Sequence, residues 1–273
     1  MNVTEIPQLK SKVQQHPFPL LFATISGAHL YGFPSSDSDF DLRGAHVLPL
    51  NRVIGIHPGK ETIDKTTVDA GMELDLVTHD VAKFFRMMLK KNGYVIEQVM
   101  SPLVVHSSAD HEELISLVPA CLTKHHIYHY LGFAKTQWEL FLKTAAAPNT
   151  AGSNTAGPRI KPLLYVYRVL LTGIHLMQTG NVQCNLQTLN EIHQSSEITE
   201  LLEIKRHGIE KQVVDQCDFS FHEKAVERLT EQLKVESERS FLPDVPSAGD
   251  AINDLLIRIR MNQFSTEYSA AQR

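Results

Sequence analysis

Two aspartates only two positions apart, Asp39 and Asp41, constrain this chain more than any other feature of its sequence. The segment 39–48 is otherwise mostly apolar and predicts a strand, so both carboxylates project from one face of it. Two carboxylates that close repel each other unless a cation lies between them. Oxygen ligands shared with substrate phosphates are typical of Mg²⁺ or Mn²⁺ sites. The pair therefore indicates a metal site on a strand.

A glycine, Gly27, lies twelve positions before the aspartate pair. It follows the apolar run 19–25, which has the length of a strand, and it opens a short predicted helix over 27–32. Backbone N–H groups at the start of a helix favour a phosphate, and glycine lets that phosphate approach the backbone closely. We interpret the segment as a phosphate-binding turn followed by a strand that carries metal ligands.

Three other interpretations compete for the same residues. Ser and Asp favour turns, so residues 35–38 are also typical of a surface loop. The spacing Asp-x-Asp-x-Asp mimics a calcium loop, but Leu42 and Leu48 occupy the positions of its glycine and its closing glutamate. Helix capping would need only one of the aspartates. The first alternative does not explain an Asp-Phe-Asp that enters an apolar strand, but the spacing alone does not decide the matter.

Residues 26–44, SGAHLYGFPSSDSDFDLRG, resemble the signature of the DNA polymerase β-like nucleotidyltransferase superfamily. Within it they are similar to the RNA-ligase-associated (RlaP-type) predicted nucleotidyltransferases, whose core reads G-S-x-x-Y-G and then S-D-x-D-x-R-G. Residues 73–102 resemble the strand, basic helix and Asn-to-Glu segment of that group. One position departs from the pattern, because Ala28 replaces the family serine. Ser26 or the backbone amides can take over its phosphate contact.

The resemblance implies a third metal-binding carboxylate from a later strand, with Asp75 as the best match and Glu73 as the alternative. Without the upstream motif, both would be interpreted as the solvent side of a hairpin strand. In the family chemistry, Asp39, Asp41 and Asp75 are the catalytic metal ligands. Asp75 would be a ligand of the ion that activates the acceptor hydroxyl. That hydroxyl would attack the α-phosphorus of a nucleoside triphosphate in line and displace pyrophosphate, whose charge a second ion would neutralise.

The predicted nucleotide and phosphate contacts come from the glycine turn, the following loop and two helices. They are Ser26, Gly27, Ala28, Ser36, Lys83, Lys161, Tyr165 and Arg168. The last three are spaced i, i+4 and i+7 on an otherwise apolar helix, which is equally typical of a salt-bridge face. Lys83 is also compatible with a solvated helix face. We expect Arg43 to pair with an acidic neighbour and Ser36 to cap its turn.

The expected fold class is α/β (α+β), with a polymerase β-like nucleotidyltransferase domain built on a small mixed sheet and a helical C-terminal domain. The predicted domains are 1–106, which is catalytic, and 107–273, which completes the cleft. Residues 145–158 are rich in Ala, Gly, Asn, Thr and Pro and predict a flexible loop. The last helix is expected near 248–262, followed by a frayed tail after Phe264.

The composition limits partners and compartment. The 273 residues carry a formal charge of −5, so contact with nucleic acid would need a local basic face. The three cysteines form no C-x-x-C pair, and neither a signal peptide nor an apolar stretch of membrane-spanning length is present in the sequence. We therefore expect a cytoplasmic protein with no membrane partner.

The sequence predicts an enzyme that moves a nucleoside monophosphate from an NTP, with Mg²⁺ or Mn²⁺ as cofactor, to an acceptor hydroxyl or phosphate. RNA, such as a tRNA-like molecule or an RNA end, is the first acceptor class. A protein side chain or a small molecule, as in toxin–antitoxin systems, is the alternative. A catalytically silent nucleotide-binding module is the third hypothesis, although it should have lost one of the paired aspartates. The acceptor, the preferred NTP and the oligomeric state stay open.

Overall fold

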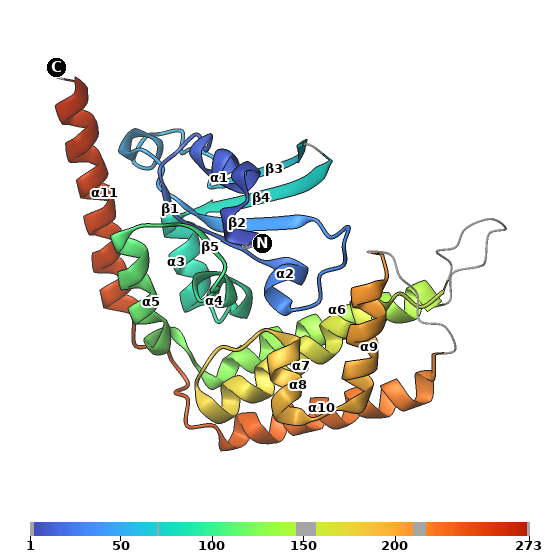
Figure 1. Cartoon of the computed structure of the whole chain (residues 1–273). Coiled ribbons are helices and arrows are strands. Elements are labelled where there is room, and N and C mark those ends of the chain that lie inside the picture. The colour runs from blue at the N-terminus through green and yellow to red at the C-terminus, as the bar shows by residue number, and fades with distance from the viewer. Residues whose placement is uncertain (1–2, 70, 146–156, 210–216, 272–273) are drawn as a thin grey trace. The chain divides into compact units, whose positions relative to one another are not determined.

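A computed structural model describes residues 3–69, 71–145, 157–209 and 217–271 (Figure 1). Most of the predicted flexible loop at 145–158 lies outside these ranges, so that prediction stays untested. None of the helices in the described ranges combines the length and the apolarity that crossing a bilayer requires.

Five strands form one mixed sheet in the order β3-β4-β2-β1-β5 (Figure 1). Their bounds are β1 Leu20–Ile25, β2 Phe40–His46, β3 Thr62–Asp69, β4 Met72–Asp80 and β5 Val104–Ser107. β2 and β4 are parallel, and the other neighbours are antiparallel. The small mixed sheet and the strands predicted over 19–25 and 39–48 are confirmed. β5 was not predicted, because four residues at a sheet edge give too little periodicity to detect.

The alternation of side chains along β2 and β4 separates a core face from a polar face. The core face carries Phe40, Leu42, Leu74 and Leu76, which pack with Ile25 and with Leu9 of α1 (Pro7–Gln14). The side chains between them on β2 and β4, including Asp41, Arg43 and Asp75, therefore belong to the opposite face. Burial of the leucines thus dictates which face presents the acidic residues.

Further helices pack against the sheet, namely α3 (Val81–Leu89), α4 (Gly93–Val99) and α5 (Ala109–Cys121). The helix α11 (Gly249–Ala271) packs against α3 and α5. The Phe22 ring of β1 meets the Phe84 ring of α3 edge-on at 5.3 Å and stacks on His111 of α5 at 4.4 Å. The predicted frayed tail after Phe264 is wrong, because α11 continues to Ala271. No Gly or Pro follows Gly249 to stop it.

The helical part is built around α7 (Ile160–Thr179), which is buried along nearly its whole length. It packs against α6 (Ile127–Ala145), α8 (Leu186–His193), α9 (Ser196–His207) and α10 (Phe219–Arg239). The helical character expected for this part of the chain is confirmed. Short 3-10 turns lie at Val3–Glu5, Leu50–Arg52 and Lys124–His126.

The chain folds into two compact units, and neither is one continuous stretch of sequence. The sheet unit contains 1–27, 39–122 and 245–273, and the helical unit contains 28–38 and 123–244. The short helix α2 (Gly27–Tyr31) therefore begins in the sheet unit, and the residues after Gly27 belong to the helical unit. The division into a catalytic domain 1–106 and a helical domain 107–273 remains a prediction about function.

Candidate active site

Two of the predicted carboxylates lie side by side on the polar face of the sheet. Asp41 of β2 and Asp75 of β4 are direct partners in the parallel register. The Arg43 Nη2 atom donates to Asp41 Oδ1 at 2.5 Å and to Asp75 Oδ2 at 2.8 Å. Arg43 Nη1 also donates to the backbone oxygen of Asp75 at 2.7 Å. The expected pairing of Arg43 with an acidic neighbour is confirmed, and one guanidinium marks a point where two carboxylates converge.

The remaining carboxylate oxygens have different surroundings. Thr66 of β3 donates its hydroxyl to Asp75 Oδ1 at 3.1 Å. Asp41 Oδ2 lies 1.9 Å from the place where a Cβ atom on Gly27 would stand, and Gly27 has a left-handed φ of +61°. Both facts require glycine at this position. Gly27 was predicted for the approach of a phosphate, and the structure adds the close approach of Asp41 as a second reason.

The site is half-buried and carries excess negative charge. The side chains of Arg43, Asp41 and Asp75 are 12%, 20% and 26% exposed. Burial alone would lower the pKa of Arg43, but the charges of Asp41, Tyr94 and Asp75 outweigh it and raise the pKa above its usual value. Arg43 is therefore a permanent cation. Two carboxylates, Asp41 and Asp75, thus share this one guanidinium.

The donor chemistry of the site fits a hard divalent cation. Asp41 and Asp75 offer oxygen ligands that converge on one point, and Asp39 directly precedes β2, two positions from Asp41. Glu73 is exposed and lies opposite Val68 of β3, whereas Asp75 shares the Arg43 guanidinium with Asp41. Among the described residues, no three His, Cys, Asp or Glu side chains form a ready-made metal site. The metal ligands remain predictions.

Ser26 lies between the end of β1 and Gly27, and its side chain is almost fully buried, at 1% exposure. Its Oγ atom has no hydrogen-bond partner among the described residues. Its backbone N–H donates to the Asp41 carbonyl at 2.8 Å. A buried hydroxyl without a partner costs about 1–3 kcal/mol, and such groups often mark a site where a ligand binds. This gives a reason to expect that Ser26 replaces the family serine lost at Ala28.

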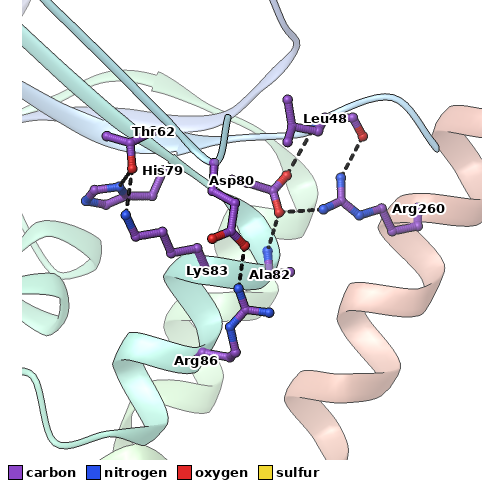
Figure 2. A network of polar contacts seen from close by, with 9 residues as sticks. Leu48, Thr62, His79, Asp80, Ala82, Lys83, Arg86 and Arg260 are labelled. Atoms are coloured by element: carbon purple, nitrogen blue, oxygen red, sulfur yellow. Dashed lines mark hydrogen bonds and ion pairs between the residues drawn. The ribbon is translucent and has the colours of Figure 1, made fainter. Parts of the chain in front are cut away.

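The end of β4 is fixed by Asp80, the N-cap of α3 (Figure 2). Asp80 Oδ1 accepts from the Ala82 backbone at 3.0 Å and from Arg260 of α11 at 2.5 Å, and Oδ2 accepts from the Leu48 backbone at 3.1 Å. Arg260 also donates to the Leu48 carbonyl at 2.6 Å. This buried ion pair ties the strand that carries Asp75 to the last helix of the chain.

Lys83 lies in the first turn of α3 and points back to the sheet (Figure 2). Its ammonium donates to Thr62 Oγ1 at 2.6 Å, and His79 Nδ1 lies 3.0 Å from the same hydroxyl. Burial, together with the charges of Lys83 and Arg43, lowers the pKa of His79 to about 4. His79 is therefore neutral at physiological pH. The predicted phosphate contact of Lys83 stays a prediction.

The other predicted nucleotide contacts belong to the helical unit. Arg168 is 1% exposed, and its guanidinium carbon lies 3.9 Å from the centre of the Tyr31 ring, a cation–π contact. Tyr165 meets the Tyr31 and Phe33 rings edge-on. Lys161 is half-buried at the start of α7. The structure thus places Arg168 and Tyr165 against the motif's own aromatic residues, and their contacts to a nucleotide stay predictions.

The serine turn before Asp39 differs from expectation. The Ser38 hydroxyl accepts from the Ser35 backbone N–H at 3.0 Å, and the Ser38 backbone N–H donates to the Ser35 carbonyl at 3.2 Å. Ser36 is exposed, so the predicted cap is Ser38 and not Ser36. Lys205 of α9 donates to Ser35 Oγ at 2.9 Å. Sequence reasoning missed Lys205, because a lysine in LLEIKRH looks like any solvated helical lysine.

A glycine turn after β1, paired carboxylates on neighbouring parallel strands and a mixed sheet followed by helices define a polymerase β-like nucleotidyltransferase. The comparison with known families is more specific. A family model described as "RNA repair pathway DNA polymerase beta family" (RlaP) matches residues 1–258, and the chain belongs to this family.

Two relatives are themselves uncharacterized. Protein MJ0002 of Methanocaldococcus jannaschii is 31% identical over 168 residues, which cover 62% of this chain and 64% of that protein, slightly less than two thirds of its length. Protein YcgL of Bacillus subtilis is 26% identical over 239 residues, covering 84% of this chain and 86% of that one. A solved nucleotidyltransferase-like protein from Exiguobacterium sibiricum matches 85% of this chain and 73% of that chain, at 12% identity and a TM-score of 0.31. That value is too low to support any conclusion.

Proposed function

We propose that this protein transfers a nucleoside monophosphate from an NTP to an acceptor on RNA, with Asp39, Asp41 and Asp75 as ligands of Mg²⁺ or Mn²⁺. The observation that supports this most is the convergence of Asp41 and Asp75 on one point between two parallel strands. The excess negative charge there favours a divalent cation. Membership of a family described by an RNA repair pathway supports RNA as the acceptor.

Each residue has a task in the proposed reaction. Gly27 keeps the backbone open beside Asp41 Oδ2, so a triphosphate bound at this turn would lie next to a carboxylate. The buried Ser26 hydroxyl is suited to donate to a phosphate oxygen. Arg43 holds the two carboxylates in a fixed orientation. When bound, the divalent cation supplies charge neutralisation at the phosphates and activation of the acceptor hydroxyl.

The proton of the attacking hydroxyl needs an acceptor in the site. We assign the role of proton acceptor to Asp75, because its carboxylate lies beside that of Asp41 on the Arg43 guanidinium. Asp75 Oδ1 accepts a hydrogen bond from Thr66. A serine or threonine of a protein could present the same hydroxyl as an RNA end. The formal charge of −5 argues against a long nucleic acid as the acceptor and favours a short RNA end bound at a local basic face.

The test is a transfer assay with each of the four NTPs labelled at the α-phosphate, with Mg²⁺. Total RNA and total protein, purified separately and denatured, serve as acceptors. The proposal expects label in the RNA fraction that is sensitive to ribonuclease and resistant to protease. Label only in protein would move the function to the protein-modifying alternative. Absence of labelling with all NTPs and both acceptors, while the NTPs still raise the melting temperature, would point to a silent nucleotide-binding module.

A further inference from the structure

The motif loop, defined as residues 28–38, is held by side chains from three successive helices of the helical unit. Arg168 of α7 covers the Tyr31 ring. Asn185, the N-cap of α8, lies against Gly32: a Cβ on Gly32, whose φ is +84°, would stand 2.5 Å from Asn185 Oδ1. Lys205 of α9 bonds to Ser35. The residues that lead into the aspartate pair are thus held by residues far along the chain.

Lys205 is the least expected of these three residues, because its side chain is fully buried, at 0% exposure. Lysine is almost never fully buried, since removing an ammonium from water costs several kcal/mol unless it is well bonded. Its Nζ atom donates to Ser35 Oγ at 2.9 Å and lies 3.5 Å from the Ile209 carbonyl. An apolar residue of similar length would fill the same space without that cost.

The bond to Ser35 continues towards the aspartates. Ser35 Oγ lies 3.0 Å from Ser38 Oγ, and the same two residues close the turn through two further hydrogen bonds. Ser38 is joined to Asp39 by a peptide bond. The ammonium of Lys205 is therefore the first member of a polar chain that ends at the residue before the first metal-binding aspartate.

We propose that Lys205 is a positioning residue: it fixes the turn 35–38 and through it the backbone from which Asp39 projects. This inference rests on the proposed function, because Asp39 must act in the reaction for its position to matter. Lys205 acts through Ser35 and has no role in binding substrate. A displacement of about 1 Å in a catalytic group can cost about 100-fold in rate, so a bond several residues away can control activity.

The first test measures the turn itself. Lys205→Met keeps most of the length of the side chain and removes the ammonium that donates to Ser35. Lys224→Met on α10 is the matched control, because Lys224 is exposed. Hydrogen exchange of the amides of 35–39, measured by mass spectrometry, should become faster in Lys205→Met and stay unchanged in the control. Equal exchange in wild type and Lys205→Met would overturn the proposal.

The second test measures the reaction of the proposed function. Lys205→Met should lower kcat about 10- to 100-fold, with little change in the KM for the NTP, since it disturbs a group that acts in the transition state. The concentration of Mg²⁺ that gives half-maximal rate should rise, and a merely structural contact would not move it. Unchanged kcat and Mg²⁺ dependence in a folded variant would overturn the proposal.

Ser35→Ala removes the acceptor of the same bond and keeps the test open if Lys205→Met does not fold. It should reproduce the loss in kcat, and the double variant should be no worse than either single one. Losses that multiply would show that the two residues act separately and would refute the polar chain. A wild type without transfer activity would refute the proposed function and the catalytic part of this inference, while the exchange experiment would still decide whether Lys205 holds the turn.

Discussion

Gly27 gives the sharpest test of how the site is built, because two independent costs meet at this residue. Its φ of +61° is strained for any residue with a side chain, at about 1–2 kcal/mol. A Cβ there would also stand 1.9 Å from Asp41 Oδ2, where ordinary contact begins at 3.4 Å. In Gly27→Ala the Asp41 carboxylate must therefore rotate away, which breaks its bond to Arg43.

The magnitude follows from these two terms. A hydrogen bond to a charged group contributes about 1.5–3 kcal/mol, so with the backbone strain Gly27→Ala should cost about 2.5–5 kcal/mol. For a chain of this size that corresponds to a fall of roughly 5–20 °C in melting temperature. Gly71→Ala is the matched control, since Gly71 has a φ of +81° but no atom within 4 Å of its Cβ position. It should cost only the strain, about 1–2 kcal/mol.

Urea unfolding of wild type and both variants measures the difference directly. The expected result is a loss in Gly27→Ala that exceeds the loss in Gly71→Ala by about the worth of the Asp41–Arg43 bond. Equal losses in the two variants would refute the close approach of Asp41 to Gly27, and with it the geometry from which the metal site is argued.

Three further predictions concern Arg43, Asp80 and His46. Arg43→Met leaves the carboxylates of Asp41 and Asp75 without their cation, so the melting temperature of the variant in EDTA should be lower than that of wild type. Added Mg²⁺ should raise the melting temperature of the variant by more than it raises that of wild type, and an equal rise in both would count against a metal at this point. Asp80→Ala should cost about 3–5 kcal/mol in urea unfolding because it leaves Arg260 buried and unpaired. Adding Arg260→Met to that variant should restore part of the lost stability, and a double variant whose loss equals the sum of the two single losses would contradict the coupling. Burial and the neighbouring charges lower the pKa of His46 from 6.5 to about 4. The unfolded state therefore binds more protons than the folded state between these pH values, so the free energy of unfolding should fall as the pH is lowered from 6.5 to 4. His46→Gln should reduce this fall, and a variant with the same fall as wild type would refute the lowered pKa of His46.

The sequence predicted the elements that local signals determine. The strands β1 and β2 followed from apolar runs of strand length and from the turn residues beside them. The pairing of Arg43 followed from its match to the family motif, and its place two positions after Asp41 on the strand puts both side chains on one face. Those features depend on neighbours within a few positions, which is why they could be read from the sequence.

Tertiary contacts between distant segments could not be read in this way. Lys205 and Ser35 are 170 positions apart, and no periodicity links a helical lysine to a serine turn. The same holds for Asn185, whose amide closes on Gly32. The length of α11 was missed because the polar tail suggested fraying, whereas the absence of Gly and Pro lets the helix continue.

The central claim is that the aspartate pair performs nucleotide transfer, and Asp41→Asn tests it most directly. The substitution keeps the size of the side chain and removes one negative charge from the proposed cation site. Asp69→Asn, at the exposed end of β3, is the matched control. With α-labelled NTP, Mg²⁺ and RNA, transfer should fall about 100- to 1,000-fold or more in Asp41→Asn and stay at the wild-type rate in Asp69→Asn, with both variants folded. An Asp41→Asn variant that transfers label as fast as the control would contradict the account.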